Sequence, residues 1–462
     1  MKVAVIGGGW AGLAAVHRLK RHGHAVTVFE TAHTLGGRAR RVHSRTLDAP
    51  IDNGQHILLG AYTETLDLMR DLGLDPDALF HRERLSLESA DGRFKLRAAA
   101  LPAPLHLLAA IAGARGLGPR EKLRLIAITS RLQGRGWRVA QGLSVAEWLD
   151  QGGQSPRAIR RFWQPLCLAA LNTPLESACA QLFAHVLRDS LGGTRHASDV
   201  LIPNVDLSRL WPDRLEAWLA ENEKDGPRSR LYRGHAVRKL ACEGAGVKVD
   251  DESFDAAVVA VNAPAAHKLL AQLDPTPEGV RYLDALSAFS HIPIATLTLR
   301  LARPWALPQA MLLLHDDPVR LHFGQWLFNR RSLRGPATKD TAAVSDADAP
   351  LLHIVVSDAG ALADQPRERV VAAIVEQIRE QTRRFGSMPS VTGHSLIVEK
   401  RATFAAVPDL ARPGNGTPWP RLWTAGDWTD TGYPAVLEGA VRSGRKAADL
   451  LHHALHRDRV QA

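Results

Sequence analysis

The first 30 residues carry the pattern that most restricts the fold of this chain. An apolar, β-branched run at Val3–Ile6 predicts a buried strand of a parallel sheet. A glycine-rich turn, a helical stretch and a second apolar run, Ala25–Phe29, follow, and that run ends at Glu30. Strand, glycine turn, helix, strand and acid in this order predict a dinucleotide-binding βαβ unit. Glu30 would then accept hydrogen bonds from the adenosine ribose, and its charge would repel a 2′-phosphate. The alternative is a glycine turn in a βαβ unit of another kind.

The glycines of this turn have the G-x-G-x-x-G spacing, and each is expected to have a different structural role. We expect Gly7 to permit the tight turn, Gly9 to let a pyrophosphate approach, and Gly12 to let the helix lie close to the sheet. The helix, expected over Ala11–Arg21 and preceded by Trp10, directs its free N–H groups and positive dipole end at the phosphates.

Two further turns are expected beside the bound dinucleotide. Gly37 and Arg38 can bring a backbone N–H group and a guanidinium to the diphosphate, although an exposed basic turn is the alternative. The polar run that starts at Asp52 contains His56, which could titrate near neutral pH. In the other interpretation of this run, Asp52 or Asn53 caps the helix expected over residues 62–72.

The C-terminal stretch is predicted to complete the cofactor site. A strand that stops at Gly426 and Asp427 puts a carboxylate at the carboxyl edge of a parallel sheet, where ligands bind in such folds. The next helix, with Pro434 in its first turn, offers positive potential to a cofactor through Ala435 and Val436. An ordinary surface helix is the alternative. In the middle of the chain, the backbone of Val237 could lie against an adenine.

Composition restricts the partners and the compartment. The three cysteines form no C-x-x-C pair, so we expect neither a disulfide framework nor a zinc site, and no metal at all. The chain has a net charge of +10, and nothing besides this charge favours a nucleic-acid partner. We expect no signal peptide and no membrane span, and a reducing compartment.

A basic segment, about Gly92–Leu149, interleaves arginine and lysine with apolar residues. Within it, Glu121–Leu132 has helical spacing. This pattern fits an interfacial helix on an anionic membrane, but it also fits a helix packed on its own domain with a solvated basic face, which we favour slightly.

Several motifs resemble the FAD-dependent amine oxidase and phytoene desaturase superfamily: the glycine turn with Glu30, Gly36-Gly37-Arg38, and the tail from Ala425 to Ala440. Other stretches resemble its squalene-associated branch, the hydroxysqualene dehydroxylases: Asp52–His56, Phe162–Thr173 and Leu187–Leu191. The resemblance covers nearly the whole chain. It implies bound FAD and the reductive removal of the hydroxyl of hydroxysqualene, which gives squalene for hopanoid synthesis.

We therefore expect an α/β fold in which a Rossmann-like FAD-binding domain is interleaved with an α+β substrate domain. The first would comprise residues 1–80, 225–270 and 405–462, and the second residues 81–224 and 271–404. Asp52 and His56 are the candidate proton donors for the catalytic step. We expect an apolar isoprenoid substrate and a cytoplasmic protein; peripheral contact with the inner face of the cell membrane and contact with upstream squalene-pathway enzymes stay open. A carotenoid desaturase and a non-redox prenyl-lipid carrier of the same fold are the alternatives, and an amine oxidase is less favoured.

Overall fold

A five-stranded parallel sheet holds the glycine turn at its carboxyl edge. This computed structural model describes residues 1–102, 105–222, 228–244, 246–329 and 350–461. The strand order is β10–β2–β1–β14–β20, with bounds β1 (Lys2–Ile6), β2 (Ala25–Glu30), β10 (Arg230–Arg233), β14 (Ala256–Val259) and β20 (Leu422–Thr424). β1 pairs in parallel with β2 on one side and β14 on the other. Its apolar residues are therefore buried on both faces, as the unbroken apolar run predicts.

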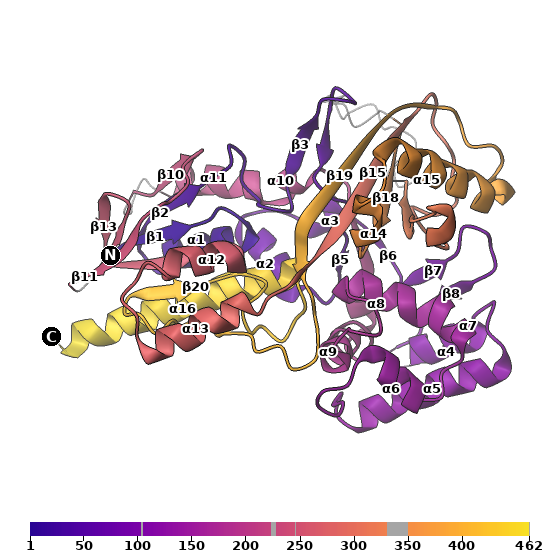
Figure 1. Cartoon of the computed structure of the whole chain (residues 1–462), viewed down its shortest axis with the longest axis horizontal. Coiled ribbons are helices and arrows are strands. Elements are labelled where there is room, and N and C mark those ends of the chain that lie inside the picture. Colours follow the sequence, from indigo (N-terminus) through magenta and orange to yellow (C-terminus); the bar gives the residue numbers. More distant parts are fainter. Residues whose placement is uncertain (103–104, 223–227, 245, 330–349, 462) are drawn as a thin grey trace.

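The two ends of the chain pack together beside this sheet. Helix α1 (Trp10–Arg21) lies against α16 (Leu437–Gln461), the long C-terminal helix at the left of Figure 1. The approach is close, because a Cβ atom on Gly444 would lie 2.0 Å from the carbonyl oxygen of Ala11. Arg18 also pairs with Asp449 across the two helices at 2.6 Å. The N-terminal strand–turn–helix unit is thus fixed by a helix more than 400 residues later in the sequence.

An antiparallel sheet forms a second layer, in the order β16–β17–β18–β15–β19. Its strands are β15 (His291–Leu301), β16 (Met311–Leu313), β17 (Trp326–Phe328), β18 (Leu351–Val356) and β19 (Val391–Phe404). Helix α15 (Arg367–Gln381) contributes its buried face, including Val370 and Ile374, to the same apolar core as this sheet. The α/β fold class expected from the sequence is confirmed.

Short helices form a lobe at the lower right of Figure 1. They are α4 (Leu105–Gly113), α5 (Pro119–Gly134), α6 (Val145–Gln151), α7 (Pro156–Ala158), a π-helix (Ile159–Trp163), α8 (Gln164–Leu171) and α9 (Ala180–Leu191). Across the described residues, no helix has both the length and the apolar character needed to cross a bilayer.

The remaining elements connect these layers. The helices are α2 (Thr63–Asp71), α3 (Pro76–Leu79), α10 (Leu207–Leu210), α11 (Pro212–Glu221), α12 (Ala263–Leu270), α13 (Pro277–Ser287) and α14 (Gly360–Ala363). The strands are β3 (Arg41–Ser44), β4 (Ala49–Asp52), β5 (Leu58–Leu59), β6 (Phe80–Glu83), β7 (Ser86–Glu88), β8 (Lys95–Arg97), β9 (Val200–Pro203), β11 (Leu240–Glu243), β12 (Gly246–Val249) and β13 (Glu252–Phe254). The domain division stays a prediction, and its boundary at residues 224 and 225 lies outside the described residues.

One local expectation is wrong, and one of the open alternatives is excluded. Helix α16 begins at Leu437, so Pro434 lies in the preceding loop, where its carbonyl accepts a hydrogen bond from Val436 N at 2.8 Å. Helix α2 is capped neither by Asp52 nor by Asn53. Instead the buried carboxylate of Glu438 accepts hydrogen bonds from Glu64 N and Thr65 N, at 3.1 and 3.0 Å. This contact joins the start of α2 to the start of α16.

Candidate active site

One cavity of about 1270 Å³ extends from the glycine turn to the helical lobe. Ligand pockets usually hold about 300–1,000 Å³, so this cavity has room for a second molecule beside a dinucleotide. Most of the cofactor-binding residues expected from the sequence line it: Gly7, Gly9, Trp10, Ala11, Glu30, Gly37, Arg38, Val237, Gly426, Asp427, Ala435 and Val436. Gly12 and Pro434 are outside the set of described residues that line it.

The glycine turn has the shape of a cradle for phosphate. Gly7 has φ +113°, which favours glycine, and a Cβ atom on Gly12 would lie 1.9 Å from the carbonyl oxygen of Gly7. Gly9 is different, because its φ of −77° suits any residue. The nearest described atom to a Cβ there would be the Cα of Gly37 at 3.8 Å. The space beside Gly9 therefore belongs to the cavity, and it fits the close approach of a diphosphate.

Glu30 is held at the end of β2 with its carboxylate at the cavity. Its Oε2 accepts a hydrogen bond from Gly8 N at 2.6 Å, and its Oε1 accepts one from Ala32 N at 2.7 Å. The second glycine turn is fixed to the first, because Gly36 N donates to the carbonyl of Gly8 at 2.9 Å. The acid and both turns thus form one preformed edge where an adenosine diphosphate fits.

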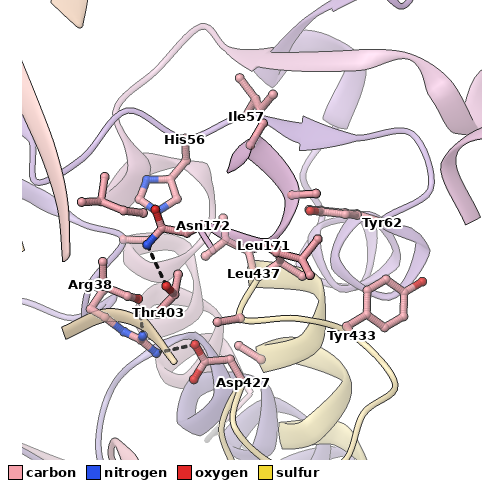
Figure 2. A pocket seen from close by; sticks show the side chains of 18 of the residues that line it. Arg38, His56, Ile57, Tyr62, Leu171, Asn172, Thr403, Asp427, Tyr433 and Leu437 are labelled. Carbon is pink, nitrogen blue, oxygen red and sulfur yellow. Dashed lines mark hydrogen bonds and ion pairs between the residues drawn. The ribbon is translucent and has the colours of Figure 1, made fainter. Parts of the chain in front are cut away.

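Arg38 and Asp427, which come from opposite ends of the chain, form an ion pair in the cavity wall. Arg38 Nη2 donates to Asp427 Oδ2 at 2.7 Å, and Nη1 donates to the carbonyl of Ala402 at 2.6 Å (Figure 2). Burial alone would lower the pKa of Arg38, but the carboxylate of Asp427 holds it above its usual value. Both residues were expected at the cofactor. The structure brings them into direct contact, with the guanidinium fixed by protein acceptors.

Arg412 is a residue that sequence analysis missed. Its guanidinium donates to the carbonyl oxygens of Asp427, Trp428, Thr429 and Tyr433. Burial lowers the pKa of Arg412 to about 10, which still leaves it charged at neutral pH. It therefore holds the whole loop that carries Asp427 to the start of α16. These four partners are backbone carbonyls, which leave no signal in the sequence, and Thr431 Oγ1 accepts a further hydrogen bond at 3.2 Å.

The two candidate proton donors are placed differently. Asp52 is buried, its Oδ1 accepts a hydrogen bond from Leu207 N at 2.8 Å, and it is outside the described lining of the cavity. His56 lines the cavity, and its Nδ1 lies 2.8 Å from the carbonyl oxygen of Gly54. Burial lowers the pKa of His56, the Gly54 carbonyl opposes this, and the nearby charge of Arg38 lowers it further. His56 is thus a neutral imidazole at pH 7, with Nδ1–H donating to Gly54 and Nε2 bonded to none of the described residues, so that it can accept from a ligand.

Two tyrosines in the wall have opposite orientations (Figure 2). The hydroxyl of Tyr433 points away from the centre of the cavity and donates to Asp189 Oδ2. The hydroxyl of Tyr62 points into the cavity, and it has no hydrogen-bond partner among the described residues. Burial first, and then the charge of Glu438, raise the pKa of Tyr62. It therefore stays protonated and can donate one hydrogen bond to a ligand. Nothing in the sequence distinguishes these two hydroxyls.

Asn172 joins the helical lobe to the antiparallel sheet beside His56 (Figure 2). It ends α8 in the left-handed conformation, with φ +50°. Its Nδ2 donates to Thr403 Oγ1 at 2.8 Å, and its Oδ1 accepts from Asp358 N at 2.8 Å. With these bonds, Asn172 fixes the position of the apolar wall formed by α8 against the polar edge of the cavity. Across the described residues, no group of His, Cys, Asp or Glu has the arrangement of a metal site.

Comparisons with known proteins agree with this geometry. The family model for flavin containing amine oxidoreductases matches residues 10–452. The chain is 30% identical to a hydroxysqualene dehydroxylase of Rhodopseudomonas palustris, over 97% of this chain and 98% of that protein. It is 26% identical to a hydroxysqualene dehydroxylase of Zymomonas mobilis, over 96% and 98%. A zeta-carotene desaturase of Synechocystis is 23% identical, over 98% and 97%. Among solved structures, an oxidoreductase from Methanosarcina mazei has a TM-score of 0.70 at 15% identity, over 97% of this chain and all of that one, which shows a shared fold.

Proposed function

Because this chain belongs to the flavin containing amine oxidoreductase family and is an FAD-dependent oxidoreductase, we propose that it converts hydroxysqualene to squalene. In this reaction the carbon–oxygen bond breaks, the oxygen leaves as water after gaining one proton, and a hydride takes its place on carbon. One hydride and one proton, which together amount to two electrons and two protons, are consumed for each hydroxyl removed. The observation that carries the proposal is the full-length similarity to two hydroxysqualene dehydroxylases.

The chain's own residues would hold the cofactor in place. Gly9 and the start of α1 fit the diphosphate, and Glu30 fits the ribose. At the other end, the free N–H groups at the start of α16 give positive potential beside Ala435 and Val436. FAD bound there would supply the hydride in its reduced form, and the positive potential at the start of α16 would favour the anionic reduced form.

The remainder of the cavity wall is mainly apolar. Leucine and aromatic side chains from several elements line it, among them Leu87, Phe162, Leu166, Leu171 and Phe328. Such a wall favours a hydrocarbon chain and keeps water away. Exclusion of water matters here, because an allylic cation formed when the hydroxyl leaves would otherwise recapture water. The cavity therefore suits a long isoprenoid with few polar groups.

Tyr62 is our candidate for binding the single hydroxyl of such a substrate. In a largely apolar cavity, an unpaired phenol donor and an alcohol oxygen are complementary, and burying either one alone is costly. Tyr433 cannot serve in the same way, because its hydroxyl is bonded to Asp189. The lowered pKa of Asp189 keeps that carboxylate charged; burial opposes this, and hydrogen bonds from Arg188 and Tyr433 outweigh it.

His56 is our favoured candidate for the proton donor because it lines the cavity, whereas Asp52 is buried, accepts a hydrogen bond from Leu207 N and is the less favoured candidate. With Nδ1–H directed at the Gly54 carbonyl, only Nε2 can take up a proton and pass it on. Since the pKa of His56 is lowered, its imidazolium is scarce at pH 7 but a strong acid when formed.

A carotenoid desaturase is the second candidate, favoured by the similarity to the zeta-carotene desaturase. The two activities run in opposite redox directions, so one experiment separates them. The purified holoprotein is reduced and mixed anaerobically with hydroxysqualene. We expect the absorbance of oxidised flavin to return while squalene forms in equal amount. Bleaching of the oxidised protein by a carotenoid precursor, with no response to hydroxysqualene, would establish desaturation instead. A colourless protein that fails to bind FAD would point to a lipid carrier.

The proposal also includes a location and partners. A substrate of this kind resides in lipid, so we propose a cytoplasmic protein in peripheral contact with the inner face of the cell membrane. Enzymes that act earlier in squalene formation would supply the hydroxysqualene. Co-purification with membranes after cell lysis, released by high salt, is the expected result of a fractionation experiment.

A further inference from the structure

Residues 95–138, which run from β8 through α4 and α5, carry most of the net positive charge of the molecule. Residues 95–138 contain nine arginine and lysine residues and one acidic residue, Glu121, so they contribute +8 to a total of +10. The carboxylate of Glu121 is engaged within the lobe: it accepts hydrogen bonds from Gly118 N at 2.7 Å and from Ser155 Oγ at 2.6 Å. The exposed arginines are Arg97, Arg115, Arg120, Arg124, Arg131, Arg135 and Arg138. Within the described part of the chain, none of these seven forms an ion pair.

Large apolar side chains are exposed among these charges. Leu105 is 53% exposed and Leu123 is 66% exposed, and Leu101 is also exposed. These are three of the seven large apolar side chains that are exposed among the described residues, and they lie within 23 positions of one another. Exposed leucines interspersed in the sequence with arginines that form no ion pair among the described residues indicate an interaction surface rather than a solvated one.

Helix α5 shows how the two kinds of residue share a face. Arg120, Leu123, Arg124 and Arg131 have the spacing i, i+3, i+4 and i+11, which places them on one side of the helix. The other side, with Leu125, is buried in the core. The exposed side is therefore apolar at its centre and basic around it. We use the term α4–α5 face for the exposed residues of these two helices, together with Arg97, Leu101 and Arg115.

Helix α4 connects this face to the cavity. Leu105 is exposed, whereas Leu107, Leu108 and Ile111 of the same helix line the cavity. Helix α4 packs against α5, which contributes Leu125 to the same lining. An apolar molecule that lies against the outer side of α4 is thus one helix away from the inside of the cavity.

We propose that the α4–α5 face docks on the anionic surface of a lipid bilayer and that the apolar substrate enters the cavity from the bilayer beside α4. Arginines bind lipid headgroups that carry negative charge, and the exposed leucines insert at the boundary of the acyl chains. The route of entry rests on the proposed function, but docking does not. A nucleic acid would satisfy the arginines alone, because its phosphate backbone offers nothing to Leu105 and Leu123.

Vesicle flotation of the FAD-loaded protein tests the docking. We expect binding to vesicles that contain phosphatidylglycerol, weak binding to pure phosphatidylcholine, and loss of binding at high salt. The double variant Leu105→Glu, Leu123→Glu should weaken binding at least tenfold. The double variant Arg120→Ser, Arg131→Ser should also weaken it about tenfold or more, since each basic residue near an anionic surface contributes about fivefold. Val319→Glu, at a side chain that is 95% exposed outside this face, should bind like the unaltered protein.

The proposal is overturned if the unaltered protein does not bind anionic vesicles at low salt, or if the leucine variant binds as well as the unaltered protein. It is also overturned if Val319→Glu loses binding equally, or if the arginines prove necessary only for binding duplex DNA. Flavin absorbance and turnover in detergent are measured for every variant, and we expect both to be unchanged. If the protein shows turnover in detergent but does not bind vesicles, only the docking is refuted. Vesicle binding without turnover would refute the reaction and the route of entry, but not the docking.

Discussion

The two tyrosines of the cavity differ in whether their hydroxyl is bonded to another described residue, and this difference gives a sharp test of substrate recognition. Tyr62→Phe removes the free donor, whereas Tyr433→Phe removes one that is already bonded to Asp189. We expect Tyr62→Phe to weaken hydroxysqualene binding about tenfold and to leave squalene binding unchanged, since only the alcohol can accept the hydrogen bond. Tyr433→Phe is the matched control and should not discriminate between the two lipids. Equal losses for alcohol and hydrocarbon in Tyr62→Phe would show a packing role only. Equilibrium binding with both ligands provides the measurement.

The lowered pKa of His56 predicts how turnover depends on pH. An acid acts only in its protonated form, and burial lowers the pKa of His56 below its usual value near 6.5. Turnover should therefore rise as pH falls through 6.5 and continue to rise below it, until the lowered pKa is reached. His56→Phe should retain its flavin absorbance and lose both most of the turnover and this acid limb. A variant that keeps the limb would exclude His56 as the proton donor. The pH profile of kcat, measured in detergent for both proteins, shows whether His56 is the proton donor.

At the scale of elements, the loop between β20 and α16 depends on one guanidinium. Arg412 donates to four backbone carbonyls of this loop, and a lysine cannot reproduce that planar set of donors. We expect Arg412→Lys to fold but to weaken FAD binding at least tenfold, because Asp427 and the start of α16 lose their fixed position. The control is Arg281→Lys, which changes an exposed pair with Glu278. FAD titration by fluorescence quenching measures both variants, and unchanged affinity in Arg412→Lys would contradict this role.

The sequence predicted well those elements whose conformation is set by residues close to one another in the sequence. The glycine turn follows from the spacing of Gly7, Gly9 and Gly12, and β2 ends at Glu30 as its apolar run indicates. Asp52 illustrates the opposite case. Its hydrogen-bond partner, the N–H of Leu207, is 155 residues away, so its burial could not be read from neighbouring residues. Pro434 is typical of a first helical turn, yet a tight turn at Val436 delays the start of α16.

In the candidate site too, local motifs could be found from the sequence, whereas contacts between distant residues could not. Arg38 and Asp427 could each be assigned to the cofactor from a motif, but their ion pair is a property of the tertiary structure. Arg412 and Tyr62 could not be found, because one acts on backbone carbonyls and the other is defined by a hydrogen bond that it lacks within the described chain. Sequence thus identifies residues whose role is set by spacing, and the structure adds those whose role is set by contact.

At the scale of the whole molecule, residues from both ends of the chain line the proposed FAD site, so FAD should stabilise those ends in particular. A ligand at 100 times its Kd adds about 2.7 kcal/mol to the free energy of unfolding. Removal of FAD should lower the melting temperature by several degrees, and hydrogen exchange should accelerate in β1, α1 and the loop before α16. Helix α15 comes from neither end, and none of its described residues lines the cavity, so it should keep its protection. Equal acceleration in all of these elements would indicate global loosening, and no acceleration at the ends would contradict their joint role in binding FAD. Exchange measured on the holoprotein and the apoprotein, with FAD added back as the control, separates these outcomes.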